Sequence, residues 1–158
     1  MTRVESYGVS SGLSWVCVAS DMGHRCGYVA IPPGHALYRK DYSDECPGVS
    51  WDDLAEVEIG KRGVMSLICV DTGKPPLVEH VFDVHGSLTF SGENFGRWWL
   101  GFDCAHVGDA PDPSICSPLY ARNMHPGDIV RSREYVEVEC ARLADQIAVR
   151  FPKEVGDE

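Results

Sequence analysis

Histidine and aspartate residues gather in one short part of this chain, at His85, Asp103, His106 and Asp109. Imidazole and carboxylate groups are common protein ligands of zinc, iron and manganese. A carboxylate that orients an imidazole also makes a general base without a metal. A structural role is a third interpretation, in which a hydrogen-bonded His–Asp pair stabilises the fold. The residue types therefore predict a candidate site and leave its chemistry open between these three.

Two expected strands position these residues. Apolar and polar residues alternate over 82–90 and again over 98–104. Successive side chains of a strand point to opposite faces, so each segment is predicted to be a strand with one apolar face. The residues between them, 91–96, are rich in turn formers. The pattern therefore predicts an antiparallel hairpin.

The expected register brings the polar residues together. Closing the hairpin with Phe90 opposite Trp98 keeps the apolar faces on one side, because a slip of one residue would turn one strand over. His85 would then lie opposite Asp103, and these two are the candidate catalytic residues. A face with polar groups and an aromatic ring suits a small polar ligand. The residues expected to contact that ligand are Thr89, Trp99, His106 and Arg122.

This region resembles the core of a family of small proteins from actinobacteria and their phages. Its members carry a His-Gly-Gly-Leu-Thr-Tyr/Phe-Ser-Gly block, followed by one like Trp-Trp-Phe-Gly-Phe-Asp-Cys-Ala-His-x-Gly-Asp. The matching segments here are 85–92 and 98–109, and Ser87 replaces the second glycine of the first block. Further matches lie within 24–29, 33–35 and 135–144. The resemblance implies a phage or prophage setting and no particular mechanism.

Composition limits the class of protein. The chain has 158 residues, of which 44% are hydrophobic and 24% charged, typical of one globular domain spanning 1–158. The formal net charge is −10, and lysine and arginine are not clustered, so direct binding to a nucleic-acid backbone is not expected. An acidic run over 41–58 is interpreted as a solvated surface.

Cysteine usage and hydropathy predict the compartment. The seven cysteines are odd in number and include no Cys-x-x-Cys pair, so a zinc ribbon and a thioredoxin-like motif are both excluded. They are expected to be buried thiols in a reducing compartment. No signal peptide and no membrane-spanning run are recognised. We therefore expect a protein of the bacterial or infected-host cytoplasm, without membrane contact.

Other segments predict the remaining elements. Residues 1–12 are expected to be a frayed lead-in, 13–19 and 24–31 a hairpin, and 64–70 a further strand. The proline-rich segment 110–127 is expected to be irregular, either a lid over the site or a plain connector.

A long helix is predicted over 131–151, with Ser132 as its N-cap. Its apolar residues recur at helical spacing and are expected to pack on the sheet. The predicted fold is therefore α+β: a mostly antiparallel sheet, a C-terminal amphipathic helix on one face, and long loops rich in proline and glycine.

The sequence favours a phage- or prophage-type accessory protein that binds a small polar, nucleotide-like molecule in a pocket lined by histidine, aspartate and tryptophan. The first alternative is a hydrolase acting on such a molecule through His85 and Asp103, with or without a metal. Zinc, iron and manganese are the candidate ions, with His85, Asp103, His106 and Asp109 as ligands. The second alternative is a module that binds a host protein. Whether the chain is an enzyme stays open.

Overall fold

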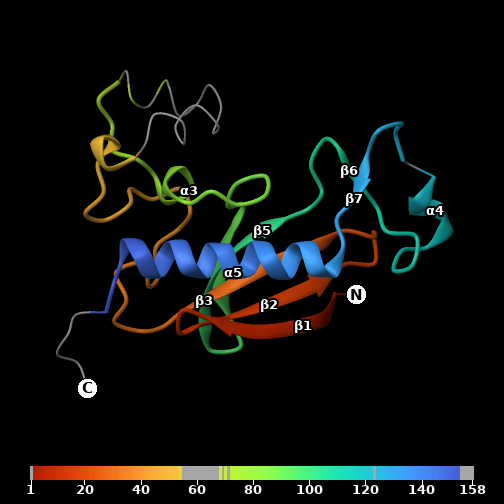
Figure 1. Ribbon diagram of the computed structural model, residues 1–158, viewed down its shortest axis with the longest axis horizontal. Helices are drawn as coiled ribbons and strands as arrows, with labels where there is room; N and C mark the ends of the chain where they lie inside the picture. The colour runs from red at the N-terminus through yellow and green to blue at the C-terminus, as the bar shows by residue number, and fades with distance from the viewer. Residues whose placement is uncertain (1, 55–67, 69, 71, 123, 154–158) are drawn as a thin grey trace.

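Five strands form one antiparallel sheet in the order β1-β2-β3-β5-β4. They span Arg3–Ser10 (β1), Leu13–Ala19 (β2), Arg25–Ile31 (β3), Phe90–Asn94 (β4) and Arg97–Asp103 (β5). A computed structural model (Figure 1) describes residues 2–54, 68, 70, 72–122 and 124–153. The sheet and the C-terminal helix confirm the predicted α+β fold.

The N-terminal half of the sheet is a three-stranded meander. The predicted bounds of β2 are confirmed, and β3 begins one residue later than predicted. The prediction of a frayed lead-in was wrong, because β1 pairs with β2 along its length. Gly8 of β1 has no room for a side chain, because a Cβ there would lie 2.4 Å from Cζ2 of Trp15. The indole therefore lies directly over β1.

The hairpin of β4 and β5 is present, but its register differs from the prediction. Phe90 pairs with Gly101 and Asn94 with Arg97. Only Phe95 and Gly96 lie between the two strands, at φ of +51° and +69°. Two residues with positive φ form the tight turn that matches strand twist. The predicted pairing of Phe90 with Trp98 was wrong because the turn is shorter than the six residues assumed.

The segment before β4 is not a strand, so the predicted pairing of His85 with Asp103 was also wrong. The chain turns at Val84–Ser87, where the amide of Ser87 donates to the carbonyl of Val84 at 2.9 Å. Gly86 and Ser87 have φ of +66° and +73°, which a regular strand cannot accommodate. Alternation still predicted burial correctly for Phe82, Val84 and Leu88.

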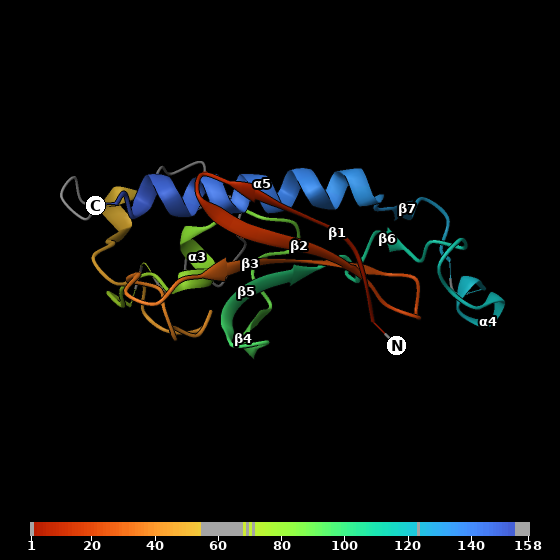
Figure 2. The same ribbon diagram turned by 90° about the horizontal axis from the view of Figure 1, so that it is seen from below.

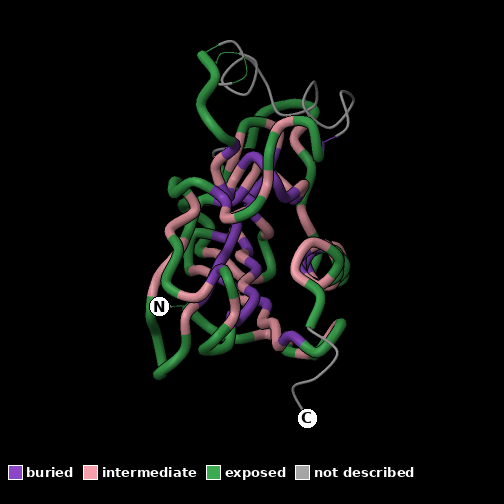
Figure 3. Tube along the Cα trace, turned by 90° about the vertical axis from the view of Figure 1, so that its left-hand side faces the viewer, coloured by how far each residue is buried: buried purple, intermediate pink, exposed green. Residues whose placement is uncertain are grey.

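Helix α5, Arg133–Arg150, packs across β1, β2 and β3 as a second layer (Figure 2). Ser132 caps it, because its side chain accepts from the amide of Tyr135. Figure 3 shows the helix exposed on its outer side and buried or half-buried toward the sheet. A Cβ at Gly27 would lie 2.6 Å from Sγ of Cys140, so this glycine lets helix and sheet approach. The buried stripe is Val136, Cys140, Leu143, Ala144 and Ile147.

Short elements make up the rest of the described chain. They are the 3-10 helix Trp51–Asp53, α3 at Val78–Val81, β6 at Asp109–Ala110, α4 at Pro118–Ala121 and β7 at Ile129–Val130. β6 pairs in parallel with β7, and both lie with α4 near the N-terminal end of α5 (Figure 1). Segment 110–127 is largely irregular, as its prolines predict.

The predicted strand over 64–70 falls mostly outside the described residues. The two residues of it that are described, Ile68 and Val70, are helical, so the prediction was wrong there. A short apolar run does not distinguish a strand from a helix by periodicity. Within the described residues, no helix has both the length and the apolarity needed to cross a membrane.

Candidate functional site

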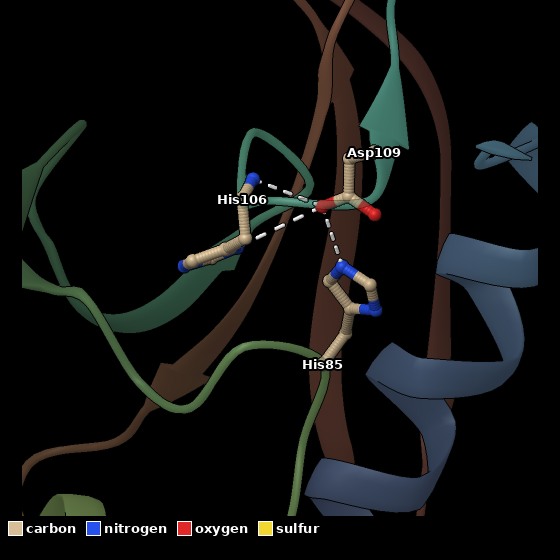
Figure 4. A group of neighbouring side chains, drawn as sticks. All are labelled: His85, His106 and Asp109. Carbon is tan, nitrogen blue, oxygen red and sulfur yellow. Dashed lines mark hydrogen bonds and ion pairs between the residues drawn. The ribbon is translucent and has the colours of Figure 1, made fainter. Parts of the chain in front are cut away.

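Three of the four residues first singled out meet beyond the end of β5. His106 lies on the connection from β5 to β6, Asp109 is the first residue of β6, and His85 lies on the turn before β4 (Figure 4). The metal-ligating atoms of the three side chains lie within 4.8 Å of one another. The structure therefore assembles this site from two loops, instead of from the predicted pair of strands.

Asp109 is the centre of the cluster, with a side chain only 2% exposed. Its Oδ2 lies 2.8 Å from Nε2 of His85 and accepts from the amide of His106 at 3.0 Å. Its Oδ1 accepts from Nε of Arg131 at 2.9 Å. Burial alone raises the pKa of Asp109, but the bonds from His85, Arg131 and the His106 amide outweigh it and hold the pKa below 3.8. Asp109 is therefore a carboxylate at neutral pH.

His85 joins this carboxylate to the C-terminal helix. Its Nδ1 lies 2.8 Å from the hydroxyl of Tyr135, which is in the first turn of α5. Arg131 stacks over the Tyr135 ring, 5.1 Å from its centroid. Burial, followed by the charge of Glu139 one turn along the helix, raises the pKa of Tyr135. The result is a continuous polar chain from Asp109 through His85 to Tyr135.

His106 contacts the same carboxylate from the other side. Its Nδ1 lies 3.7 Å from Oδ2 of Asp109 and 3.4 Å from Oδ1 of Asp103. This nitrogen is buried and has no hydrogen-bond partner within the described chain. The ring lies against Gly86, where a Cβ would be 2.2 Å from Cε1 of His106. One turn of the chain therefore carries His85 and positions His106.

Asp103 and Thr89 lie at the edge of the cluster. The hydroxyl of Thr89 donates to Oδ2 of Asp103 at 2.9 Å, and Oδ1 accepts from the amide of Ala105 at 3.1 Å. Asp103 therefore borders His106 and makes no contact with His85. Asp103, the predicted partner of His85, is thus a neighbour of His106 instead.

The structure does not bring Trp99 and Arg122 to this cluster. Trp99 is 9% exposed, and its indole N–H donates to the carbonyl of Asn94 at 2.9 Å, toward the far end of β5. Arg122 is exposed after α4. Neither lines the pocket described next.

A pocket of about 500 Å³ opens in front of His106 and Asp109. Tyr120 and His125 of segment 110–127 line this pocket together with Asp128, which follows the segment. His24 lines it from the other side, with Nδ1 2.8 Å from the carbonyl of Cys104. Because a carbonyl only accepts, Nδ1 carries the hydrogen.

Arg25 fixes the wall of this pocket, and its side chain is only 6% exposed. It forms ion pairs with Glu5 at 2.6 Å and with Asp112 at 2.9 Å. It also donates to the carbonyl of Arg131 at 2.9 Å. The Arg25 guanidinium therefore connects Glu5 of β1, Asp112 and Arg131, which is the residue that donates to Asp109.

Cys104 is excluded as a nucleophile. Its side chain belongs to the core, and burial raises the pKa of its thiol to about 12. A reactive cysteine needs an exposed, electropositive position that favours the thiolate. The packing interpretation of this cysteine is therefore correct.

Sequence patterns missed Arg131 and Tyr135 as site residues. Tyr135 falls within a segment of the family resemblance, whereas nothing in the local pattern singles out Arg131. Both reach the site through long-range pairing, Arg131 after β7 and Tyr135 on the docked helix. Comparisons with protein-family models, with curated proteins and with solved structures find no match to this chain.

Proposed function

We propose that the protein binds a small polar, nucleotide-like molecule in the pocket beside His106 and Asp109. The observation that carries this proposal is the pocket itself, about 500 Å³ in volume and lined by three histidines and two aspartates. Ligand pockets commonly have volumes of about 300–1,000 Å³ and a few converging polar groups. A cytoplasmic phage or prophage setting would suit the capture of such a molecule.

The lining offers separate surfaces to the two parts of a nucleotide. Tyr120 is 38% exposed and supplies an aromatic ring on which a base can stack. This ring takes the role predicted for Trp99. His24, His106 and His125 supply imidazole groups that can hydrogen-bond to phosphate or ribose oxygens. Asp128 can accept from a base amino group or a ribose hydroxyl.

Hydrolysis of the bound molecule is the second candidate function, favoured by the chain Asp109–His85–Tyr135. An imidazole held between a carboxylate and a phenol resembles the arrangement that orients a general base. Asp109 takes the orienting role predicted for Asp103. A general base of this kind would act on a ligand bound in the pocket, where the His106 side chain is 34% exposed.

Equilibrium titration with a panel of nucleotides tests the proposal. We expect one class to bind with a Kd in the micromolar range, and His24→Ala and His125→Ala to weaken it by about tenfold each, since each removes one polar contact. Absence of any binding tighter than about 1 mM refutes the proposal. Chromatography of the recovered ligand separates the two candidates, because a binding protein returns it intact and a hydrolase returns product.

A further inference from the structure

We infer that His85, His106 and Asp109 form a binding site for a divalent first-row transition-metal ion such as Zn²⁺, at the inner end of the pocket. The inference deepens the proposed function and rests on it only for the role of the ion as an anchor for ligand. Two histidines and one carboxylate are a ligand set used by catalytic zinc and by non-haem iron.

The distances suit an ion with short bonds to nitrogen and oxygen. Zinc bonds of about 2.0–2.1 Å place two ligand atoms of a tetrahedral site roughly 3.3 Å apart. Oδ2 of Asp109 lies 2.8 Å from Nε2 of His85 and 3.7 Å from Nδ1 of His106, on either side of that separation. All three ligand atoms lie within 4.8 Å of one another, so side-chain rotation can bring them onto one ion.

Tyr135 can support His85 as a ligand. Its hydroxyl lies 2.8 Å from Nδ1 of His85, so Nδ1 can donate to the phenol oxygen. Nε2 then points its lone pair toward Oδ2 of Asp109, 2.8 Å away, and a metal ion can be shared by these two atoms.

His106 supplies an independent observation. Its Nδ1 is buried and lies 3.4 Å from Oδ1 of Asp103 and 3.7 Å from Oδ2 of Asp109, yet it has no hydrogen-bond partner in the described part of the chain. A metal ion shared with His85 and Asp109 gives this nitrogen a partner, and an unpaired buried polar atom otherwise costs free energy.

The surroundings match the outer shell of a metal site. Metal-bound histidines donate their second N–H to an oxygen, and Nδ1 of His85 has the Tyr135 hydroxyl at 2.8 Å for this purpose. The second oxygen of Asp109 is held by Arg131 at 2.9 Å, which leaves Oδ2 for the ion. Gly86 fixes the position of the His106 ring by close contact. Each proposed ligand therefore has a supporting group.

The position of the ion indicates what it would bind. His106 and Asp109 both line the pocket, so an ion between them adjoins it. Three protein ligands leave a coordination position free for water or ligand. An anionic oxygen, such as that of a phosphate group, is the chemistry that would occupy it.

Metal titration of the full chain tests the site. Protein stripped with chelator is titrated with Co²⁺ and with Zn²⁺, and Co²⁺ is followed by its absorption spectrum. We expect one equivalent to bind with a Kd below about 1 µM. His106→Ala should weaken this at least tenfold, whereas His35→Ala, which removes a histidine that packs against Phe151 outside the pocket, should leave it unchanged.

Binding weaker than about 100 µM overturns the inference. Equal affinity in His106→Ala overturns it as well, as does a thiolate-to-cobalt charge-transfer band, since the described chain has six free cysteines. If His106→Ala does not fold, ¹⁵N spectra of the wild-type histidines decide. Zn²⁺ should shift the ring nitrogens of His85 and His106 and not those of His24, and any other pattern overturns the inference.

The nucleotide panel, run with chelator and again with Zn²⁺, separates this inference from the proposed function. If Zn²⁺ binds and no nucleotide does, the proposed function is refuted and the metal site is supported. If a nucleotide binds and Zn²⁺ does not, the proposed function is supported and the metal site is refuted.

Discussion

Gly86 and His106 are packed so closely that position 86 has no room for a side chain. A Cβ there would lie 2.2 Å from Cε1 and 2.4 Å from Nδ1 of the imidazole. The φ of Gly86 is +66°, a conformation that L side chains rarely adopt. The turn that presents His85 to Asp109 therefore also determines where the ring of His106 lies.

Gly86→Ala should displace His106 as well as strain the turn. The matched control is Gly48→Ala, because Gly48 has a φ of +69° and open space around its Cβ position. Backbone strain alone should cost Gly48→Ala about 1 kcal/mol of the free energy of unfolding. Gly86→Ala should cost about 1–3 kcal/mol more and shift the ¹⁵N resonances of His106. Equal losses in chemical denaturation would show that the ring adapts freely.

Tyr135→Phe removes the hydroxyl that contacts His85 and keeps the ring that stacks with Arg131. A partly buried imidazole nitrogen then loses its partner, so the free energy of unfolding should fall by about 1–3 kcal/mol. Tyr7→Phe is the control, because Tyr7 is 81% exposed and should change stability by less than about 0.5 kcal/mol. Urea denaturation of both variants measures the difference, and an unchanged midpoint for Tyr135→Phe would contradict the polar chain.

Asp112 should give the fold a measurable dependence on acid pH. Burial raises the pKa of Asp112, but bonds from Ser114 and Arg25 outweigh it and hold the pKa below 3.8. A depressed folded pKa stabilises the fold above the unfolded value and loses that contribution as pH falls through the folded value. Asp112→Asn should therefore cost about 1–3 kcal/mol at pH 7, and progressively less as pH falls below 3.8.

Denaturation of wild type and Asp112→Asn from pH 7 to pH 3 tests this sign. Asp52→Asn is the control, since Asp52 is exposed and should differ from wild type by less than about 0.5 kcal/mol throughout. A gap between wild type and Asp112→Asn that widens on acidification would contradict the prediction.

Ser132→Ala should loosen the start of α5. The Ser132 side chain accepts from the amide of Tyr135, and removal of such a cap costs about 1 kcal/mol. Ser117 holds the same position before α4 without any side-chain capping bond, so Ser117→Ala should be nearly neutral. Thermal unfolding compares the two, and hydrogen exchange at Tyr135 should rise only in Ser132→Ala.

Local patterns were sufficient for the elements that bury one face. The apolar run at Leu13–Ala19 matches β2 in full, and the helical spacing from Val136 to Ile147 places the buried stripe of α5. In both segments the buried residues recur with the period of the strand or helix, so the sequence pattern shows which residues are buried. Ser132 was recognisable as an N-cap because the preference is chemical and local.

Patterns failed where distant contacts decide the structure. β1 is poor in apolar inward-facing residues and forms because β2 is beside it, with Trp15 over Gly8. Phe82 to Leu88 alternate like a strand, but the positive φ of Gly86 turns the chain instead. The grouping of His106 with Asp109 was visible locally, whereas the arrival of Arg131 depended on the pairing of β6 with β7.

The dependence of the site on Arg131 and Tyr135 has a consequence for the order of events during synthesis. A ribosome releases the chain from its N-terminal end, so His85, His106 and Asp109 emerge before either partner. Until the first turn of α5 has left the ribosome and docked, the Asp109 carboxylate has no guanidinium and His85 has no phenol. A chain interrupted during translation would therefore carry all three central residues without the two side chains that hold Asp109 and His85 in place.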